Sequence, residues 1–326
     1  MSCELSIIVP CYNTPKHRLR QCMESLEFVG RILPYEVWFI DDGSREDYIV
    51  SFVQEYGNPS FHAIRQQNMG CGGARNTGID LCQGRYITFV DSDDFIYYGP
   101  YIEMLKVLKA KQPDILAQGY SFCFEGPATS FMMSYDVHPS CCSYIIRRSL
   151  LNELRFTPHI FHEDEEFTTR LHLLRAHLIT LNFSAYFYRQ EPDSIVHNRD
   201  PRHIAKRFED FLGVMDRLKS LTPPAPHELA LRRRLDVMAM CFLVMLMRDC
   251  ATGRDISCWI QLLRKRGFYP LPFRWHGMRY LFATIFTMHP FIVRVIAPFV
   301  KLYLKIKDAS AEKRTFTAYA DTADAV

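Results

Sequence analysis

The sequence predicts an α/β fold, with a mostly parallel sheet, helices on both of its faces and a C-terminal helical region. Three observations predict it. Short apolar runs alternate with longer amphipathic ones, acidic clusters directly follow two of the apolar runs, and the pattern after about residue 200 is helical throughout. Such alternation is typical of parallel sheets, whose ligands bind outside the carboxyl ends of the strands.

The elements are expected in a regular order through the first third of the chain. Apolar runs predict strands at residues 5–9, 36–40, 61–65 and 86–90, and helical spacing predicts helices at 16–29, 45–56 and 72–83. Beyond residue 110 the pattern is mixed. We expect strands there at 114–124, 144–146, 178–181 and 185–188, and a helix at 164–176.

Three regions are expected along the chain. Residues 1–220 form a large α/β domain with an N-terminal half at 1–110 and a second half at 111–220. A Pro-rich break at residues 221–226 marks its end. Residues 221–308 form the helical C-terminal region, and the Ala-, Thr- and Asp-rich residues 309–326 are expected to be disordered.

Composition excludes several classes of protein. A net charge of +3 over 326 residues is too small to indicate a nucleic-acid partner. The 11 cysteines are odd in number, scattered and without a CxxC pair, which argues against a disulfide-stapled domain and a zinc site. The N-terminal residues lack the charged and apolar regions of a signal peptide. We therefore expect a cytoplasmic protein.

The acidic cluster Asp91-Ser92-Asp93 follows the fourth predicted strand directly. Two carboxylates in one strand-exit turn repel each other unless a cation neutralises them, and hard divalent ions prefer oxygen ligands. The alternative is a polar turn or helix cap. Asp94 is expected to serve the N-terminus of the helix that follows.

A second cluster, Asp41-Asp42-Gly43-Ser44, has the same form. Its acids either accept hydrogen bonds from a nucleobase or ribose, or Asp42 or Ser44 caps the next helix.

Two further segments point to polar chemistry. The glycine-rich residues 68–78 lead into a helix but match neither GxGxxG nor a Walker sequence, so the glycines indicate close backbone approach instead. Arg75 within them is expected to bond a carboxylate or phosphate. Residues 163–166 are four consecutive acids at a predicted helix start, where negative charge interacts favourably with the helix macrodipole. Four acids are more than helix capping requires. The alternative is that one of them acts as a general base.

These four clusters, together with the opening residues 6–13, resemble glycosyltransferase family 2 in their order and spacing. The matching segments are Ser6-Ile7-Ile8-Val9-Pro10-Cys11-Tyr12-Asn13, Ile40-Asp41-Asp42-Gly43-Ser44, Asn68-Met69-Gly70 with Ala74-Arg75-Asn76-Thr77-Gly78, Phe89-Val90-Asp91-Ser92-Asp93-Asp94, and Glu163-Asp164 with Phe167. The resemblance covers roughly residues 5–195 and implies the Rossmann-like GT-A fold.

The resemblance also implies a role for each matching residue. Asp164 is the implied catalytic base. Nucleotide-sugar binding is implied for Pro10, Tyr12, Asn13, Asp41, Asp42, Ser44, Asn68, Gly70, Arg75, Asp91, Ser92, Arg189 and Ser194. A divalent cation, Mn²⁺ or Mg²⁺, is implied on Asp93 and Asp91, with His197 as a further ligand. Arg189 and Ser194 resemble a segment that closes over the diphosphate.

The implied activity is inverting transfer of a hexose or N-acetylhexosamine from a nucleotide diphosphate donor, with UDP favoured by family habit. The acceptor is a hydroxyl of a glycan or lipid-linked molecule in cell-surface polysaccharide synthesis. A non-catalytic nucleotide-sugar-binding component of an assembly complex is the alternative. A nucleotidyltransferase would need a basic glycine-rich loop where Pro10-Cys11-Tyr12-Asn13 stands.

The C-terminal helical region leaves two alternatives open. Residues 238–247 are too short to span a bilayer, and residues 278–306 are interrupted by charged residues and prolines. The second stretch is rich in aromatic and basic residues. It therefore fits either peripheral contact with the inner face of the plasma membrane, or packing and homo-oligomerisation through the helices.

Overall fold

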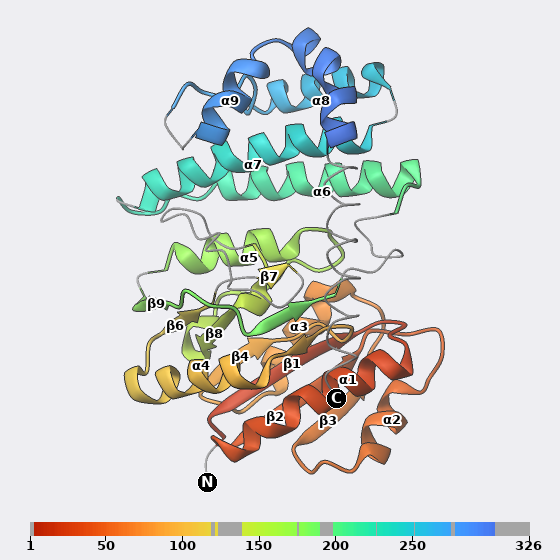
Figure 1. Cartoon of the computed structure of the whole chain (residues 1–326), viewed down its shortest axis with the longest axis vertical. Coiled ribbons are helices and arrows are strands. Elements are labelled where there is room, and N and C mark those ends of the chain that lie inside the picture. The colour runs from red at the N-terminus through yellow and green to blue at the C-terminus, as the bar shows by residue number, and fades with distance from the viewer. Residues whose placement is uncertain are drawn as a thin grey trace, which may run out of the picture. The chain divides into compact units, whose positions relative to one another are not determined.

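The computed structural model describes residues 3–118, 121–122, 139–174, 176–189, 198–225, 227–250, 252–274 and 278–303. The chain forms two compact units, Met1–Glu191 and Pro192–Val326. The boundary expected at 220/221 lies inside the second unit. It falls between α6 (Pro201–Lys219) and α7 (His227–Asp249), two helices that pack side by side (Figure 1).

The first unit is built on a seven-stranded sheet in the order β3-β2-β1-β4-β8-β6-β9. Its strands are β1 (Leu5–Cys11), β2 (Tyr35–Asp41), β3 (Phe61–Arg65), β4 (Tyr86–Phe89), β6 (Ile115–Ala117), β8 (Tyr144–Arg147) and β9 (Leu178–Thr180). β8 is antiparallel to both of its neighbours, and the other pairs are parallel. The predicted mostly parallel sheet is confirmed.

A three-stranded sheet accompanies the main one, in the order β5 (Phe95–Ile96), β10 (Tyr186–Tyr188) and β7 (Ser121–Phe122). The single strand expected at 114–124 is therefore wrong. Residues 115–117 pair in the main sheet, whereas residues 121–122 pair with β10 in the small one.

Helices lie on both faces of the main sheet. Their bounds are α1 (Lys16–Leu26), α2 (Ile49–Tyr56), α3 (Gly70–Leu81), α4 (Tyr98–Lys111) and α5 (Glu163–His172), with short 3₁₀ helices at Glu27–Arg31, Cys141–Ser143 and Arg148–Leu151. Because parallel crossovers are right-handed, the steps β1-β2-β3 place α1 and α2 on one face. The reversed step from β3 to β4 places α3 on the other.

The centre of this sheet is apolar on both faces. All seven residues of β1 are buried, as are all four of β4. Gly78 lets α3 approach β1 closely, because a Cβ atom there would lie 2.4 Å from Cγ2 of Ile8. The strand order reverses between β1 and β4, and ligands of open α/β sheets bind at such a reversal.

The second unit is helical in its described residues. Asp200 caps α6 by accepting from the amides of Arg202 (2.7 Å) and His203 (3.2 Å). Thr252 and Asp255 form a capping box at the start of α8 (Gly253–Lys265). α9 (Met278–Phe286) and a helix at residues 290–303 follow. Within the described ranges, no helix has the length and apolar character that crossing a bilayer requires.

Candidate active site

The carboxyl ends of β1, β2 and β4 are neighbours, and polar side chains join them. The amide of Asn13, after β1, donates to Oγ of Ser44, after β2, at 2.9 Å. On the other side of β1, the hydroxyls of Thr14 and Ser92 are 2.6 Å apart. The structure therefore brings the expected site residues of three strands to one edge of the sheet.

The β2 exit is closed by its own carboxylates. Asp41 is fully buried; its Oδ1 accepts from the Ser44 amide at 2.9 Å and its Oδ2 pairs with Arg65 at 3.3 Å. Asp42 is buried too, and its Oδ1 accepts from the Met69 amide at 2.8 Å. These bonds fix the shape of the loop and tie it to the start of α3.

Neither acidic cluster caps a helix. The N-cap residue of α2 is Tyr48, several residues beyond the expected caps Asp42 and Ser44. The N-cap residue of α4 is Tyr97, so Asp94 does not serve a helix N-terminus as expected. The carboxylates of Asp42 and Asp94 instead accept hydrogen bonds from groups far along the chain, Gln66 and Met69 for Asp42 and Tyr186 and Arg189 for Asp94.

Asp94 is buried beneath the β4 exit. Its Oδ2 accepts from the Tyr186 hydroxyl at 2.6 Å and its Oδ1 from the Arg189 amide at 2.7 Å. Burial, followed by the nearby charges of Asp91 and Asp93, raises the pKa of the Asp94 carboxyl to about 8. Three carboxyl groups are therefore crowded together at the β4 exit.

Tyr186 is a site residue that the sequence interpretation missed. It lies in β10, and its hydroxyl oxygen also accepts from the Asp91 amide at 3.1 Å. A single tyrosine in a three-residue strand carries no sequence signal, because its role depends on the small sheet lying next to the exit of β4 in the main sheet.

Arg189, expected in a segment over the diphosphate, lies beside the β4 exit. Its Nε donates to the Asp93 carbonyl at 2.9 Å and its Nη2 to Oε1 of Gln21 at 2.9 Å. The guanidinium also stacks over the rings of Phe95 and Phe187, 5.5 and 5.7 Å from their centroids. A cation is therefore held next to the acidic turn.

Arg75 connects the β4 exit to the start of α5. Its side chain is almost fully buried; one guanidinium nitrogen lies 2.9 Å from Oδ1 of Asp91 and another lies 2.6 Å from Oε1 of Glu163. The guanidinium also lies over the Phe156 ring, 5.3 Å from its centroid. The expected bond from Arg75 to a carboxylate is thus present, with two carboxylates bound at once.

Asp164 differs from its neighbour Glu163. Its Oδ1 accepts from the Glu165 amide at 2.8 Å, and no ion pair to its side chain forms within the described residues. Burial, followed by the charges of Glu163 and Glu165, raises the pKa of the Asp164 carboxyl well above its ordinary value. His162 precedes the helix in a left-handed conformation (φ 65°), which sets the direction in which α5 starts.

The remaining expected donor residues surround these groups. Pro10 is buried in β1, whereas the Tyr12 side chain is 52% exposed and able to stack on a ligand. Asn68 is exposed, and its Oδ1 accepts from the Gly70 amide at 3.3 Å. Gly70 opens α3 with φ 75°, a conformation that favours glycine. Ser194 and His197 lie outside the described residues.

The residues present are compatible with a divalent cation. Asp93 is exposed at the acidic β4 exit, and the crowded carboxylates there would be relieved by positive charge. In the described part of the chain, no three His, Cys, Asp or Glu side chains form a ready-made metal cage. Asp93 is the exposed carboxylate there that would hold such a cation.

This fold is that of the GT-A glycosyltransferases. The chain belongs to glycosyltransferase family 2: the model described as "Glycosyl transferase family 2" matches residues 6–169. The family predicted from the sequence is confirmed, and the chain is a glycosyltransferase.

Individual proteins extend the comparison. "Glycosyltransferase GlyG" of Streptococcus pneumoniae is 26% identical over 226 residues, which are 60% of this chain and 74% of GlyG. "Poly(ribitol-phosphate) beta-N-acetylglucosaminyltransferase TarS" of Staphylococcus aureus is 26% identical over 235 residues, 65% of this chain and 39% of TarS.

Solved structures share the fold. TarS 1–349 in complex with UDP-GlcNAc has a TM-score of 0.57 at 19% identity and covers 80% of this chain and 85% of its own. The mannosyltransferase PcManGT of Pyrobaculum calidifontis, in complex with GDP-Man and Mn²⁺, has a TM-score of 0.55 at 16% identity. The match covers 94% of this chain and 88% of PcManGT.

Proposed function

We propose that this enzyme transfers a sugar, with inversion, from a UDP-sugar to a hydroxyl of a glycan or lipid-linked acceptor in cell-surface polysaccharide synthesis. TarS, whose structure contains UDP-GlcNAc, supports UDP as the nucleotide and an N-acetylhexosamine or hexose as the sugar. The acceptor class rests on the names of relatives that act on cell-surface polymers.

The Arg75 bridge is the observation that carries the proposal. It fixes a β4-exit acid, Asp91, and the first residue of α5, Glu163, to one buried cation. Donor-side and acceptor-side acids therefore belong to a single site. The bridge also distinguishes two adjacent acids, because Glu163 is neutralised by Arg75 whereas Asp164 is not.

Asp164 is therefore the proposed base. A carboxylate whose pKa is raised binds a proton more strongly than an ordinary one. In the proposed step, the acceptor oxygen bonds to the anomeric carbon while the bond from that carbon to the diphosphate breaks. The acceptor proton passes to Asp164. A single displacement of this kind inverts the anomeric centre, so an α-linked donor gives a β-linked product.

The donor would lie across the three strand exits. We assign the nucleobase to the Tyr12 side of the β1 exit, with Pro10, Asn13 and Asn68 around it. The buried Asp41, Asp42 and Ser44 support the pocket wall through the bonds described above. Gly70 lets the backbone approach, and Asp91 and Ser92 line the path toward the diphosphate. Arg189 would face the leaving group, with Ser194 further along the same segment.

A divalent cation, Mn²⁺ or Mg²⁺, is proposed on Asp93, with Asp91 beside it and His197 as a further candidate. Asp93 is exposed in the turn where negative charge is crowded. Such an ion stabilises the charge that develops on a departing diphosphate.

The test compares Asp164→Asn with Glu163→Gln. A thermal-shift screen of nucleotide sugars first selects the donor, and UDP release is then followed with a panel of glycoside acceptors. We expect Asp164→Asn to lower the transfer rate about a hundred- to ten-thousand-fold, because the base is removed, with UDP affinity nearly unchanged. Glu163→Gln should retain the base and transfer measurably. The assignment is wrong if Asp164→Asn transfers at a near-native rate while Glu163→Gln is inactive.

A further inference from the structure

The helix formed by residues 290–303 has two separate apolar faces. On its inner face Val293 and Ala297 are buried, and Ile296 and Val300 line an apolar groove shared with α7 and α9. The groove is completed by Met240, Leu243, Val244, Met247, Ala283 and Thr287. The inner face therefore already holds the helix in the second unit.

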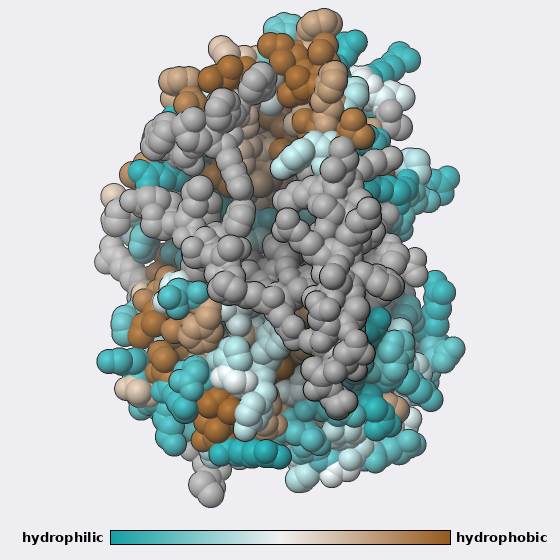
Figure 2. Space-filling model, in the orientation of Figure 1, coloured by the Kyte–Doolittle hydropathy of each residue, from teal (hydrophilic) through white to brown (hydrophobic). Residues whose placement is uncertain are grey.

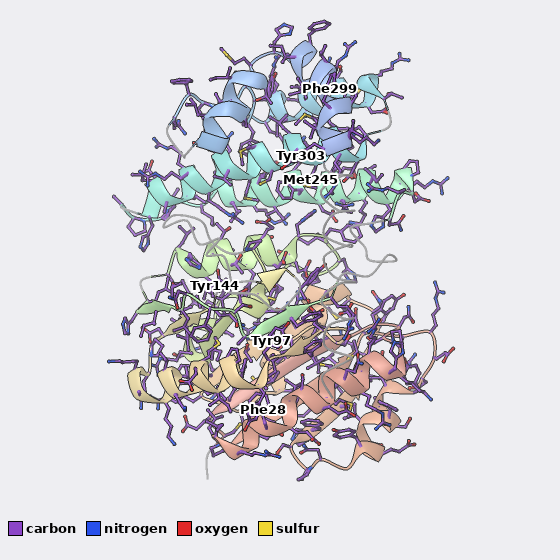
Figure 3. The ribbon with its side chains drawn as sticks, in the orientation of Figure 1. Phe28, Tyr97, Tyr144, Met245, Phe299 and Tyr303 are labelled. Carbon is purple, nitrogen blue, oxygen red and sulfur yellow. The ribbon has the colours of Figure 1, made fainter. Side chains whose placement is uncertain are left out.

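The outer face is apolar as well and is exposed. Phe291, Val295, Phe299 and Leu302 are exposed by 60, 49, 71 and 57%. Their spacing of four, four and three residues places them in one stripe along the helix. Figure 3 labels Phe299 on this helix together with Tyr303, which is 65% exposed. Single apolar residues scattered over a surface are normal, but four large ones in a continuous stripe indicate an interaction surface.

The hydropathy surface agrees with this arrangement. Figure 2 shows hydrophobic residues gathered over the part of the second unit that contains α8, α9 and the helix at residues 290–303. We call the exposed Phe291, Val295, Phe299 and Leu302 the outer stripe.

Positive charge accompanies the outer stripe. Arg294 and Lys301 are seven residues apart, so they lie on one side of the helix, at the border of the stripe. Neither forms an ion pair with an acidic side chain in the described residues. Residues 256–307 contain no Asp or Glu, while their Lys and Arg residues are Arg264, Lys265, Arg266, Arg274, Arg279, Arg294, Lys301, Lys305 and Lys307.

This charge distinguishes between two partners for an apolar stripe. In a symmetric dimer the same patch meets itself, so Arg294 and Lys301 would approach their own copies, and residues 256–307 offer no acid to pair with them. An anionic lipid surface offers the complementary charge and an apolar layer beneath it. Charge complementarity therefore favours the lipid surface over a second copy.

We infer that the outer stripe docks this enzyme on an anionic lipid bilayer. The helix would lie in the plane of the interface, with its stripe at the headgroup–acyl boundary and Arg294 and Lys301 at the phosphates. None of the outer-stripe residues is among those proposed for transfer, so the inference stands or fails independently of the proposed function.

The test is sedimentation of the full-length protein with vesicles of 30% phosphatidylglycerol in phosphatidylcholine, and with pure phosphatidylcholine vesicles. We expect binding to the anionic vesicles that weakens with salt. The Arg294→Gln/Lys301→Gln variant should bind about 30-fold more weakly, since each basic residue near an anionic surface contributes about a factor of five. Phe291→Ser/Phe299→Ser should also lose binding, because the insertion is apolar.

The matched control removes two charges elsewhere in the same unit. Lys206→Gln/Arg232→Gln changes the net charge equally, but these residues pair with Asp210 and Glu228 on their own helices at 2.8 Å. If binding depends on where the basic residues lie and not on net charge alone, the vesicle binding of this control should stay within about twofold of wild type. Circular dichroism and UDP affinity should be native-like in all three variants.

Three outcomes would overturn the inference. The first is a wild-type protein that does not bind anionic vesicles. The second is a control variant that loses as much binding as Arg294→Gln/Lys301→Gln. The third is a dimer in analytical ultracentrifugation that Phe291→Ser/Phe299→Ser dissociates, without vesicle binding by the wild type. That result would assign the outer stripe to a second copy.

Discussion

The exits of β2 and β4 have the same sequence form, an apolar strand followed by acids, but their buried acids are held in different ways. At the β2 exit, Asp41 pairs with Arg65, and Asp42 accepts from Gln66 and from a backbone amide. At the β4 exit, Asp94 is buried without an ion pair in the described residues, and its pKa is raised to about 8.

The difference comes from what the neighbouring strand supplies. Next to β2 lies β3, whose last residue is Arg65 and which is followed by Gln66. Next to β4 lie β1 and β8, and the β4 exit instead receives Arg75 from α3, which pairs with Asp91. The acids of the β2 exit are thus bound by side chains of the neighbouring strand and loop, whereas the buried Asp94 of the β4 exit is held by a tyrosine hydroxyl and a backbone amide and has a raised pKa, as is common at functional sites.

The largest expected effect separates the two arginines. Arg75→Gln should lower the free energy of unfolding by about 3 kcal/mol, because it leaves Asp91 and the mostly buried Glu163 without their cation. Arg65→Gln should lower it by no more than about 1 kcal/mol, because Arg65 is one-third exposed and its ion pairs are screened by water.

Urea denaturation of both variants in EDTA measures this difference. Adding Glu163→Gln to Arg75→Gln should restore part of the lost stability, since one unpaired charge is removed. Equal losses for the two single variants would mean that the β2 and β4 exits depend on their arginines alike, against the comparison.

The second effect concerns pH. Because the pKa of Asp94 is raised from 3.8 to about 8, the folded protein holds a proton there that the unfolded chain releases above pH 4. This contribution to stability is complete below about pH 4 and is lost as pH rises toward 8, by up to about 1.4 kcal/mol per pH unit. Asp94→Asn cannot ionise and should lose this slope.

Thermal unfolding of wild type and Asp94→Asn is measured in EDTA between pH 5 and 8. The slope is the change with pH in the difference between their free energies of unfolding. The variant should gain stability relative to wild type as pH rises. A constant difference between Asp94→Asn and wild type would show that Asp94 is ionised throughout this range.

The fold was largely predictable from local pattern, because each central strand is a continuous apolar run. The prediction for β3 matches its bounds, and those for β1, β2 and β4 differ by a few residues. The helix expected after Asp94 was predicted without bounds; it is α4, whose buried Tyr101, Met104, Leu105 and Leu108 have helical spacing. The antiparallel β8 and the division of residues 114–124 between two sheets depend on long-range pairing, which local pattern does not contain.

The site was predictable as a set of motifs but not as a set of contacts. Motif spacing indicated Arg75, Asp91 and Glu163, yet only the fold shows that one guanidinium binds both acids. Tyr186 escaped because its partner, Asp94, is 92 residues away. Helix capping was the wrong alternative for Asp94, since capping is a local rule and this carboxylate bonds across the chain.

The central claim is that the β4 exit, unlike the β2 exit, binds the diphosphate through a divalent cation. Calorimetry of UDP binding in EDTA and in Mn²⁺ tests it with wild type, Asp93→Asn and Asp42→Asn. Wild type should bind UDP at least about tenfold more tightly in Mn²⁺, since the exposed carboxylates otherwise repel the diphosphate.

In the same measurement, Asp93→Asn should lose that gain, whereas Asp42→Asn should bind more weakly in both buffers and keep the ratio between them. Asp93 is exposed, so its substitution should change the free energy of unfolding by less than about 0.5 kcal/mol. An unchanged Mn²⁺ gain in Asp93→Asn, or its loss in Asp42→Asn, would contradict the account.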